Sequence, residues 1–306
     1  MPLAAREHVA TMMGKEWGEQ MIKGWNNAGW MSLSTQIGDR IAPLIGAEPG
    51  HVIMGDTLSI KVHQALAAAL ALNPGRKVIL SDYGNFPSDL YIAQGLIKTL
   101  DRGHTLKTVA PEDVSHHIDD QVAVLMLTEV DYRTGRKHDM QALTATAHAH
   151  GVITLWDLAH SVGALPVDLV GSNVDFAVGC TYKYLNGGPG APAFIYVCPA
   201  YVNKVDSSLS GWLGHAAPFD FELDYRAAPG IERLRVGTPP VIALKCLEPA
   251  LDIWDLVTID QVRKQSIALC ELFIREVEAR CPGLTLNSPR NAQERGSQVP
   301  FCFEEG

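Results

Sequence analysis

The chain has 306 residues, of which 47% are hydrophobic, enough for one large domain with or without a small second one. Its formal charge is −9 and it has no lysine or arginine block, which argues against partners such as nucleic acid or an anionic membrane surface. No apolar run approaches the ~18 residues of a membrane-spanning helix. The N-terminal sequence lacks a signal-peptide pattern, so we expect a cytoplasmic protein.

Helical and strand patterns alternate from about residue 50 onward, which is typical of an α/β fold with a mostly parallel sheet and helices on both faces. Helices are expected over 57–72, 87–100, 139–150, 240–254 and 260–280. Strands are expected over 77–80, 104–109, 121–127, 151–156, 174–178, 193–197 and 299–306.

We expect three parts: an N-terminal helical segment over 1–50, a large domain over 51–255, and a bridging helix with the start of a smaller C-terminal α+β domain over 256–306. The stretch 207–240 differs from the rest because it is rich in glycine, proline and aromatic residues and has little periodicity. Such a long loop is expected to be functional or to pack on a partner.

Lys183 is the most informative residue, because it follows the apolar run 174–178 and precedes a glycine-rich stretch at 187–190. Asp157 ends another apolar run 26 residues upstream. Two such strands side by side would place both side chains where α/β sheets bind ligands. A lysine amine can form a Schiff base with pyridoxal 5'-phosphate (PLP), and an aspartate can pair with the pyridinium nitrogen of that cofactor. The pair therefore predicts a PLP enzyme.

Weaker signals surround this pair. His160 could support Asp157 or the cofactor ring, or be a satisfied structural histidine. The stretch 56–60 precedes an alanine-rich helix and could bind a phosphate, although it also fits an ordinary helix cap. Phe86 could stack on a planar cofactor and Asp89 could reach its polar edge, although core packing and capping explain them equally well.

The six cysteines show no CxxC pair or zinc spacing, and the histidine pairs are badly placed for a metal, so we expect free thiols and no metal site.

Four motifs together resemble the bacterial kynureninase family, which belongs to the aminotransferase class V superfamily and has PLP fold type I. These motifs lie at 86–91, 156–163, 181–188 and 209–215, within a likeness that covers essentially the whole chain. The resemblance implies hydrolysis of L-kynurenine to anthranilate and L-alanine, a step of tryptophan catabolism. It also implies a homodimer with shared active sites.

Carried over residue by residue, the resemblance makes Lys183 the Schiff-base lysine, Asp157 the pyridinium partner and Tyr182 a catalytic phenol. Trp212 and Thr238 would reach the phosphate of the neighbouring subunit, and Trp25 would contact the substrate ring. The remaining cofactor contacts implied by the family are Leu58, Ser59, Phe86, Pro87, Ser88, Asp89, Thr128 and His160.

Two departures from the family pattern stand out. An Asp-Gly-Asn-Ser-Leu-Gly-like motif near the family's start is missing, and the arginine that binds the substrate carboxylate would follow residue 306. We therefore expect a family member clipped at both ends. Two alternatives stay open: a cysteine desulfurase or β-lyase of the same fold, for which Cys281 and Cys302 lack the expected glycine- or serine-rich setting, and a truncated PLP-binding homologue without turnover.

Overall fold

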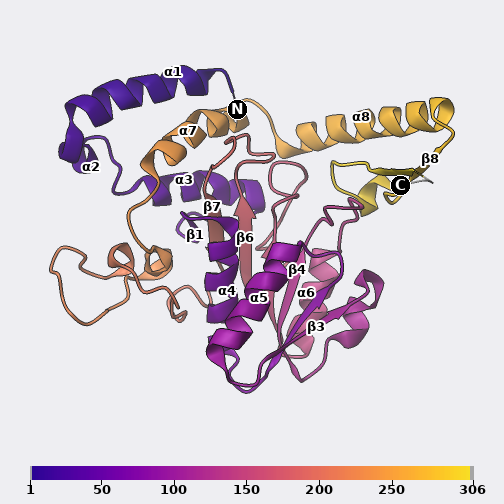
Figure 1. Ribbon diagram of the computed structural model, residues 1–306, viewed down its shortest axis with the longest axis horizontal. Helices are drawn as coiled ribbons and strands as arrows, with labels where there is room; N and C mark the ends of the chain where they lie inside the picture. Colours follow the sequence, from indigo (N-terminus) through magenta and orange to yellow (C-terminus); the bar gives the residue numbers. More distant parts are fainter. Residues whose placement is uncertain (1, 304–306) are drawn as a thin grey trace.

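The computed structural model describes residues 2–303 and contains a seven-stranded sheet with helices on both faces (Figure 1). The strand order is β1-β7-β6-β5-β4-β2-β3. The sheet strands are β1 Val52–Met54, β2 Val78–Asp82, β3 Thr105–Val109, β4 Val122–Thr128, β5 Ile153–Asp157, β6 Phe176–Cys180 and β7 Ala193–Val197. The five strands from β6 to β3 are parallel, whereas β7 and β1 are antiparallel to their neighbours, so the predicted mostly parallel sheet is confirmed.

The helices agree with the predicted positions to within a few residues. They are α1 Ala4–Thr11, α2 Gly24–Asn27, α3 Leu33–Ile41, α4 Leu58–Leu72, α5 Pro87–Leu100, α6 Met140–Ala149, α7 Val241–Leu251 and α8 Ile259–Arg280. Local signals set their ends: the Asp139 carboxylate caps α6 through the Ala142 N–H, and Thr258 with Gln261 forms a capping box at α8.

Alternate strand residues face opposite sides of the sheet and build two cores. Val124 and Met126 of β4 pack in the core that α4 and α5 cover, whereas Leu125 and Leu127 pack in the core under α3, α6 and α7. Figure 1 shows α4 and α5 in front of the sheet. Strand β6, which precedes Lys183, is shifted by two residues from the expected 174–178, and Asp175 just before it is held by bonds from its carboxylate to Thr154 and His148.

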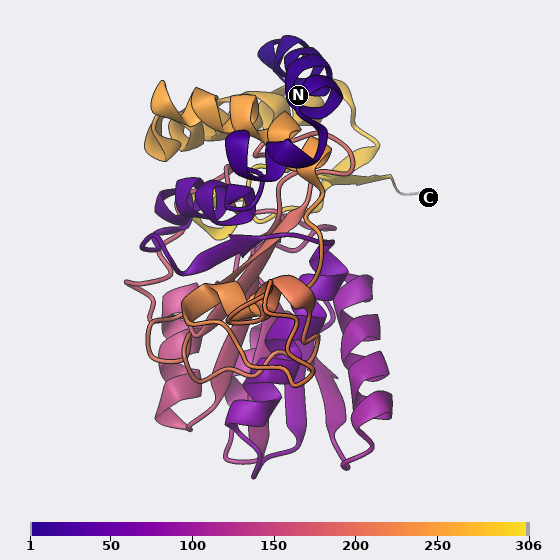
Figure 2. The ribbon, with the colours of Figure 1, turned by 90° about the vertical axis from the view of Figure 1, so that its left-hand side faces the viewer.

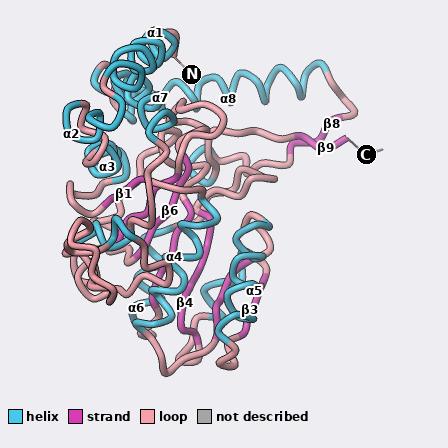
Figure 3. Tube along the Cα trace, turned by 60° about the vertical axis from the view of Figure 1, so that its left-hand side comes forward, coloured by secondary structure: helices cyan, strands magenta, loops and turns pink. Residues whose placement is uncertain are grey.

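Two segments lie outside this layered unit. Residues 207–240 form irregular loops with short 3₁₀ turns beside β1, as Figure 2 shows in orange at the side of the sheet. Helix α8 leads away to the two-stranded β8 Leu284–Leu286 and β9 Phe301–Phe303, which are antiparallel (Figure 3). The expected division into three parts at residues 50 and 255 stays a prediction. Among residues 2–303, no helix is both long and apolar enough to cross a membrane.

Candidate active site

The carboxyl ends of three neighbouring parallel strands bring the predicted residues together. Thr128 ends β4, Asp157 ends β5, and Lys183 follows the end of β6 by three residues. Thr128 lies in register with Asp157, so the two side-chain positions are adjacent across the sheet. This edge of a parallel sheet is where α/β proteins bind ligands.

A pocket of ≈ 250 Å³ opens at this edge. It combines an amine, a carboxylate, hydroxyls and aromatic rings, a composition suited to a flat, partly charged ligand. Its lining residues are Thr57, Leu58, Ser59, Phe86, Ser88, Thr128, Tyr132, Asp157, Ala159, His160, Tyr182 and Lys183.

The amine of Lys183 points into the pocket beside His160. Lys183 Nζ lies 2.7 Å from His160 Nε2 and 5.9 Å from the centre of the Phe86 ring. Burial and then the nearby Lys183 lower the pKa of His160 to about 4, so this imidazole is neutral near pH 7. A neutral imidazole has one accepting nitrogen, which lets His160 accept a hydrogen bond from Lys183 and hold its amine.

Two buried carboxyl groups lie deeper in the site. Asp157 is 4% exposed, and burial raises its pKa to about 6, against the opposing effects of the Ala159 N–H and of Lys183. Asp89 is 1% exposed, and burial followed by the charge of Asp157 raises its pKa well above the ordinary value. Asp157 accepts a 2.9 Å hydrogen bond from the Ala159 N–H, and no ion pair reaches it within residues 2–303. A cation placed beside Asp157 would therefore satisfy a carboxylate that the protein leaves without one.

Aromatic side chains form the walls. Phe86 is 41% exposed toward the pocket, and the Asn85 side chain fixes its backbone by accepting a 2.7 Å bond from the Phe86 N–H. Asn85 is itself held by bonds from its amide to Ser81 and to the Met126 carbonyl. Tyr182 stands beside Lys183, and burial, the largest cause, raises its pKa to about 12. Tyr182 therefore keeps its phenolic proton near pH 7.

The start of α4 closes one end of the pocket. Thr57 is the N-cap residue, and Leu58 and Ser59 open the helix, so their N–H groups have no partner within the helix. The positive end of a helix favours a phosphate. Asp56 precedes this turn at φ 57, and its carboxylate lies 3.3 Å from the fully buried Lys61 ammonium. That ion pair fixes the approach to the helix start.

These features fit PLP. The lysine amine matches its aldehyde, and the carboxylate that lacks a cation matches its ring nitrogen. The exposed aromatic face matches its ring, and the free helix start matches its phosphate.

Comparison with known proteins identifies the family. Residues 29–306 match the aminotransferase class-V family model. The chain is 47% identical to the kynureninases of Pseudomonas fluorescens and Burkholderia pseudomallei over 312 aligned residues. Each alignment covers 100% of this chain and 75% of the relative. The chain belongs to the kynureninase family of class-V aminotransferase proteins.

Solved structures show the same fold at low identity. A cysteine desulfurase from Thermococcus onnurineus superposes with a TM-score of 0.81 at 19% identity, covering 99% of this chain and 76% of that one. The cystine C–S lyase C-DES, in complex with its product cysteine persulfide, superposes with a TM-score of 0.85 at 19% identity, covering 99% and 81%. These neighbours support the fold that the kynureninase family has, and the expected fold class is confirmed.

Not every residue that the kynureninase resemblance predicts reaches this pocket. Trp25 packs edge-on against Trp30 and lines a separate apolar cavity of ≈ 1030 Å³, and Thr238 lines that same cavity. Trp212 is 44% exposed in the irregular loops and packs edge-on against Phe219. Pro87 begins α5 behind the pocket wall. Asp89 is buried near Asp157 but does not line the pocket either. The roles expected for all the predicted site residues, inside the pocket or outside it, stay predictions.

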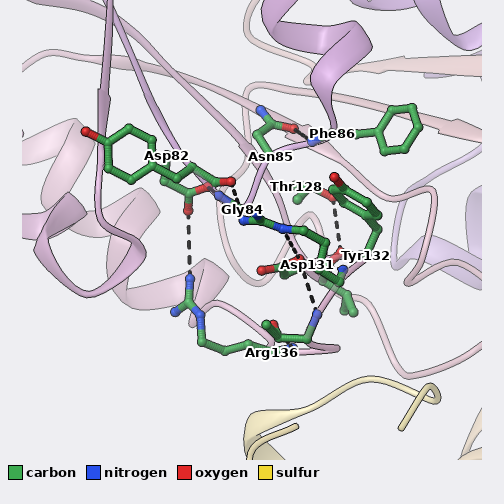
Figure 4. Close-up of polar contacts among 12 residues, drawn as sticks. Asp82, Gly84, Asn85, Phe86, Thr128, Asp131, Tyr132 and Arg136 are labelled. Carbon is green, nitrogen blue, oxygen red and sulfur yellow. Dashed lines mark hydrogen bonds and ion pairs between the residues drawn. The ribbon is translucent and has the colours of Figure 1, made fainter. Parts of the chain in front are cut away.

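Several residues of this kynureninase site escaped the sequence reasoning. Ala159 and Tyr132 line the pocket, and Asp82 holds the turn before Phe86 by accepting from the Gly84 N–H and by contacting His138 at 2.6 Å. Figure 4 shows Asp82 facing Arg136, with Asp131 and Gly84 next to the turn that carries Phe86. Tyr132 follows the end of β4 by four residues, but its contact with the pocket depends on how residues 130–137 fold back, which no local sequence pattern indicates.

Proposed function

We propose that this protein hydrolyses L-kynurenine to anthranilate and L-alanine with PLP as its cofactor. The pocket in which Lys183, Asp157 and His160 meet carries the proposal. The 47% identity to kynureninases over the whole chain supports it.

The chemistry of such a site divides between cofactor and protein. When bound, PLP withdraws electrons from the bonds of the substrate carbon that bears the amino group. Asp157 would hold a negative charge toward the ring nitrogen, and Phe86 would face the ring. The start of α4, with Leu58 and Ser59, would bind the phosphate through N–H groups and a hydroxyl.

Protons are handled by this chain's own side chains. Lys183 would hold the cofactor through its amine in the resting enzyme, and the free amine would take and return the proton at the substrate's α-carbon. His160 stays neutral and orients the lysine amine through the 2.7 Å contact. Tyr182 keeps its proton because its pKa is raised, so it can donate to an oxygen of the substrate or of the attacking water.

The cysteine positions disfavour the desulfurase alternative. That reaction needs a thiolate near the cofactor, yet no cysteine lines the Lys183 pocket in the part of the chain that the structure describes. Burial raises the pKa of Cys180 to about 11, which keeps that nearby thiol protonated. Cys281 and Cys302 are exposed beyond α8 and on β9.

A homodimer with shared active sites is part of the proposal. Trp212 and Thr238 are exposed and lie outside their own pocket, as side chains that serve a partner's site would. The cytoplasmic location stays a prediction.

The proposal is tested with purified protein loaded with PLP. Kynurenine should yield anthranilate, which is read by its fluorescence, whereas cysteine should yield no sulfide. Lys183→Ala should abolish both the visible absorption of bound PLP and anthranilate formation. Sulfide release would move the protein to the desulfurase class, and PLP binding without either product would make it a binding homologue without turnover.

A further inference from the structure

The loop between β4 and α6 makes a tight turn over residues 130–137, here named the 130–137 turn. Val130 and Lys137 pair across its base, the Asp131 N–H donates to the Arg136 carbonyl at 2.9 Å, and the Gly135 N–H donates to the Asp131 carbonyl at 2.8 Å. These bonds make it a rigid unit. It begins two residues after Thr128, so it stands at the mouth of the pocket.

One side of this turn touches the cofactor pocket. Tyr132 lines the pocket, and its ring meets the Phe86 ring edge-on, with centres 5.0 Å apart and planes at 79°. Arg133 steadies this arrangement, because its guanidinium lies 5.7 Å from the centre of the Tyr132 ring and donates to the Tyr83 carbonyl at 2.5 Å. The edge-on pairing fixes the angle of the Phe86 ring.

The base of the turn is equally constrained. The Asp131 carboxylate accepts a 2.7 Å bond from the Arg133 N–H, and a Cβ placed on Gly84 would come within 3.0 Å of that carboxylate. The 130–137 turn therefore contacts the turn that carries Phe86 through Gly84, through the Arg133 bond to the Tyr83 carbonyl and through the two aromatic rings (Figure 4).

The other side of the turn is held by the segment that follows α8. The Gln298 amide donates to the Asp131 carbonyl at 3.0 Å and to the Tyr132 carbonyl at 2.8 Å. Gly135, at φ 71, leaves no room for a side chain, because a Cβ there would lie 2.6 Å from the Gln298 carbonyl. The Gly296 N–H adds a 2.7 Å bond to the Gly135 carbonyl. A single side chain, Gln298, thus binds the carbonyls of the two peptide groups that flank the Tyr132 Cα.

We propose that Tyr132 and Gln298 are positioning residues for the cofactor ring. Tyr132 holds Phe86 at the angle needed to cover PLP, and Gln298 holds Tyr132, so the segment after α8 controls the order of the pocket wall. The inference rests on the proposed function for the identity of the cofactor, and it adds two residues to that site.

Equilibrium binding of PLP tests this inference without relying on turnover. Tyr132→Ala should raise the dissociation constant of PLP by about 2- to 13-fold, the range expected for loss of an edge-on aromatic pair, and should weaken the visible circular dichroism of the bound cofactor. Tyr132→Phe keeps the ring and should stay within about 2-fold of wild type. Gln298→Ala should act in the same direction as Tyr132→Ala and by no more than its about 2- to 13-fold, because Gln298 affects the cofactor only by holding Tyr132.

Gln293→Ala is the matched control, since it removes an exposed amide from the same segment whose side chain contacts nothing in the pocket. Wild-type affinity and dichroism in Tyr132→Ala, or equal losses in Tyr132→Ala and Tyr132→Phe, would overturn the inference. If Tyr132→Ala does not fold, as judged by thermal melting without PLP, the PLP dissociation constants of Gln298→Ala and Gln293→Ala are compared instead. Equal dissociation constants in these two variants would then overturn the inference. Failure of the wild type to bind PLP would instead overturn the proposed function.

Discussion

Replacing Asp157 by asparagine separates the effect of this carboxylate on PLP binding from its effect on the free energy of unfolding. Burial raises its pKa from an ordinary value of 3.8 to about 6, so charging it is harder in the folded protein than in the unfolded chain. Because its pKa is raised on folding, the Asp157 carboxyl makes its full contribution to the free energy of unfolding below the unfolded pKa. This contribution is lost as the pH rises through the folded pKa. The gap of about 2 pH units corresponds to about 3 kcal/mol.

Without PLP, Asp157→Asn should therefore be more stable than the wild type. The difference in the free energy of unfolding should be close to zero below pH 4, about half its full size at pH 5, and up to about 3 kcal/mol at pH 8. The asparagine oxygen can still accept the bond from the Ala159 N–H, so this contact is kept. Removing the charge also relieves Asp89, whose pKa the Asp157 charge raises, while Lys183 loses a favourable neighbour.

Urea unfolding of both cofactor-free proteins at pH 5 and pH 8 measures this difference. With PLP present the order should reverse, since loss of a buried charge-assisted contact typically costs ~2–5 kcal/mol and should weaken PLP binding by about 30- to several-thousand-fold. If cofactor-free Asp157→Asn is less stable than the wild type at pH 8, the carboxylate is satisfied by the protein itself and the reasoning fails.

Two further predictions concern the lysine and the assembly. Borohydride treatment of the PLP-loaded protein should fix the cofactor on Lys183, and peptide mapping that finds it on another lysine would contradict the site. Lys183→Ala subunits mixed with Trp212→Ala/Thr238→Ala subunits should regain activity through one intact site per hybrid dimer. Confirmed hybrids without activity would exclude a shared site.

The sequence was sufficient for the part of the site that depends on strand ends. Buried strands of a parallel sheet read as short apolar runs, and the residue after each run lies at the ligand-binding edge. That reasoning placed Asp157 and Lys183 together, and the structure has them lining one pocket. The sequence could not predict the direction of β7, because a fully buried strand has the same apolar pattern whether it is parallel or antiparallel. Strand β1, at three residues, is too short to give a periodic signal.

Tyr132 shows why the rest of the site could not be predicted. Its place in the pocket depends on the chain folding back over 130–137, on a carbonyl accepting from Gln298 more than 160 residues away, and on a ring angle set by Phe86. None of these is a local property of the sequence. Trp212 and Thr238 pose the same problem on a larger scale, because their proposed partner is another subunit.

The buried carboxylates of this fold show how a functional site differs from a structural one. Asp82 and Asp175 are about as buried as Asp157, yet Asp82 binds Gly84 and His138, and Asp175 binds Thr154 and His148. These two carboxylates have the partners that burial demands and only hold the backbone in place. Asp157, by contrast, has one backbone N–H among the residues that the structure describes. Asp157 also lies close enough to Asp89 for its charge to raise the Asp89 pKa. A fold selected for stability alone would not keep such a pair, so the lack of partners, rather than burial, supports the proposal that Asp157 faces a cofactor cation.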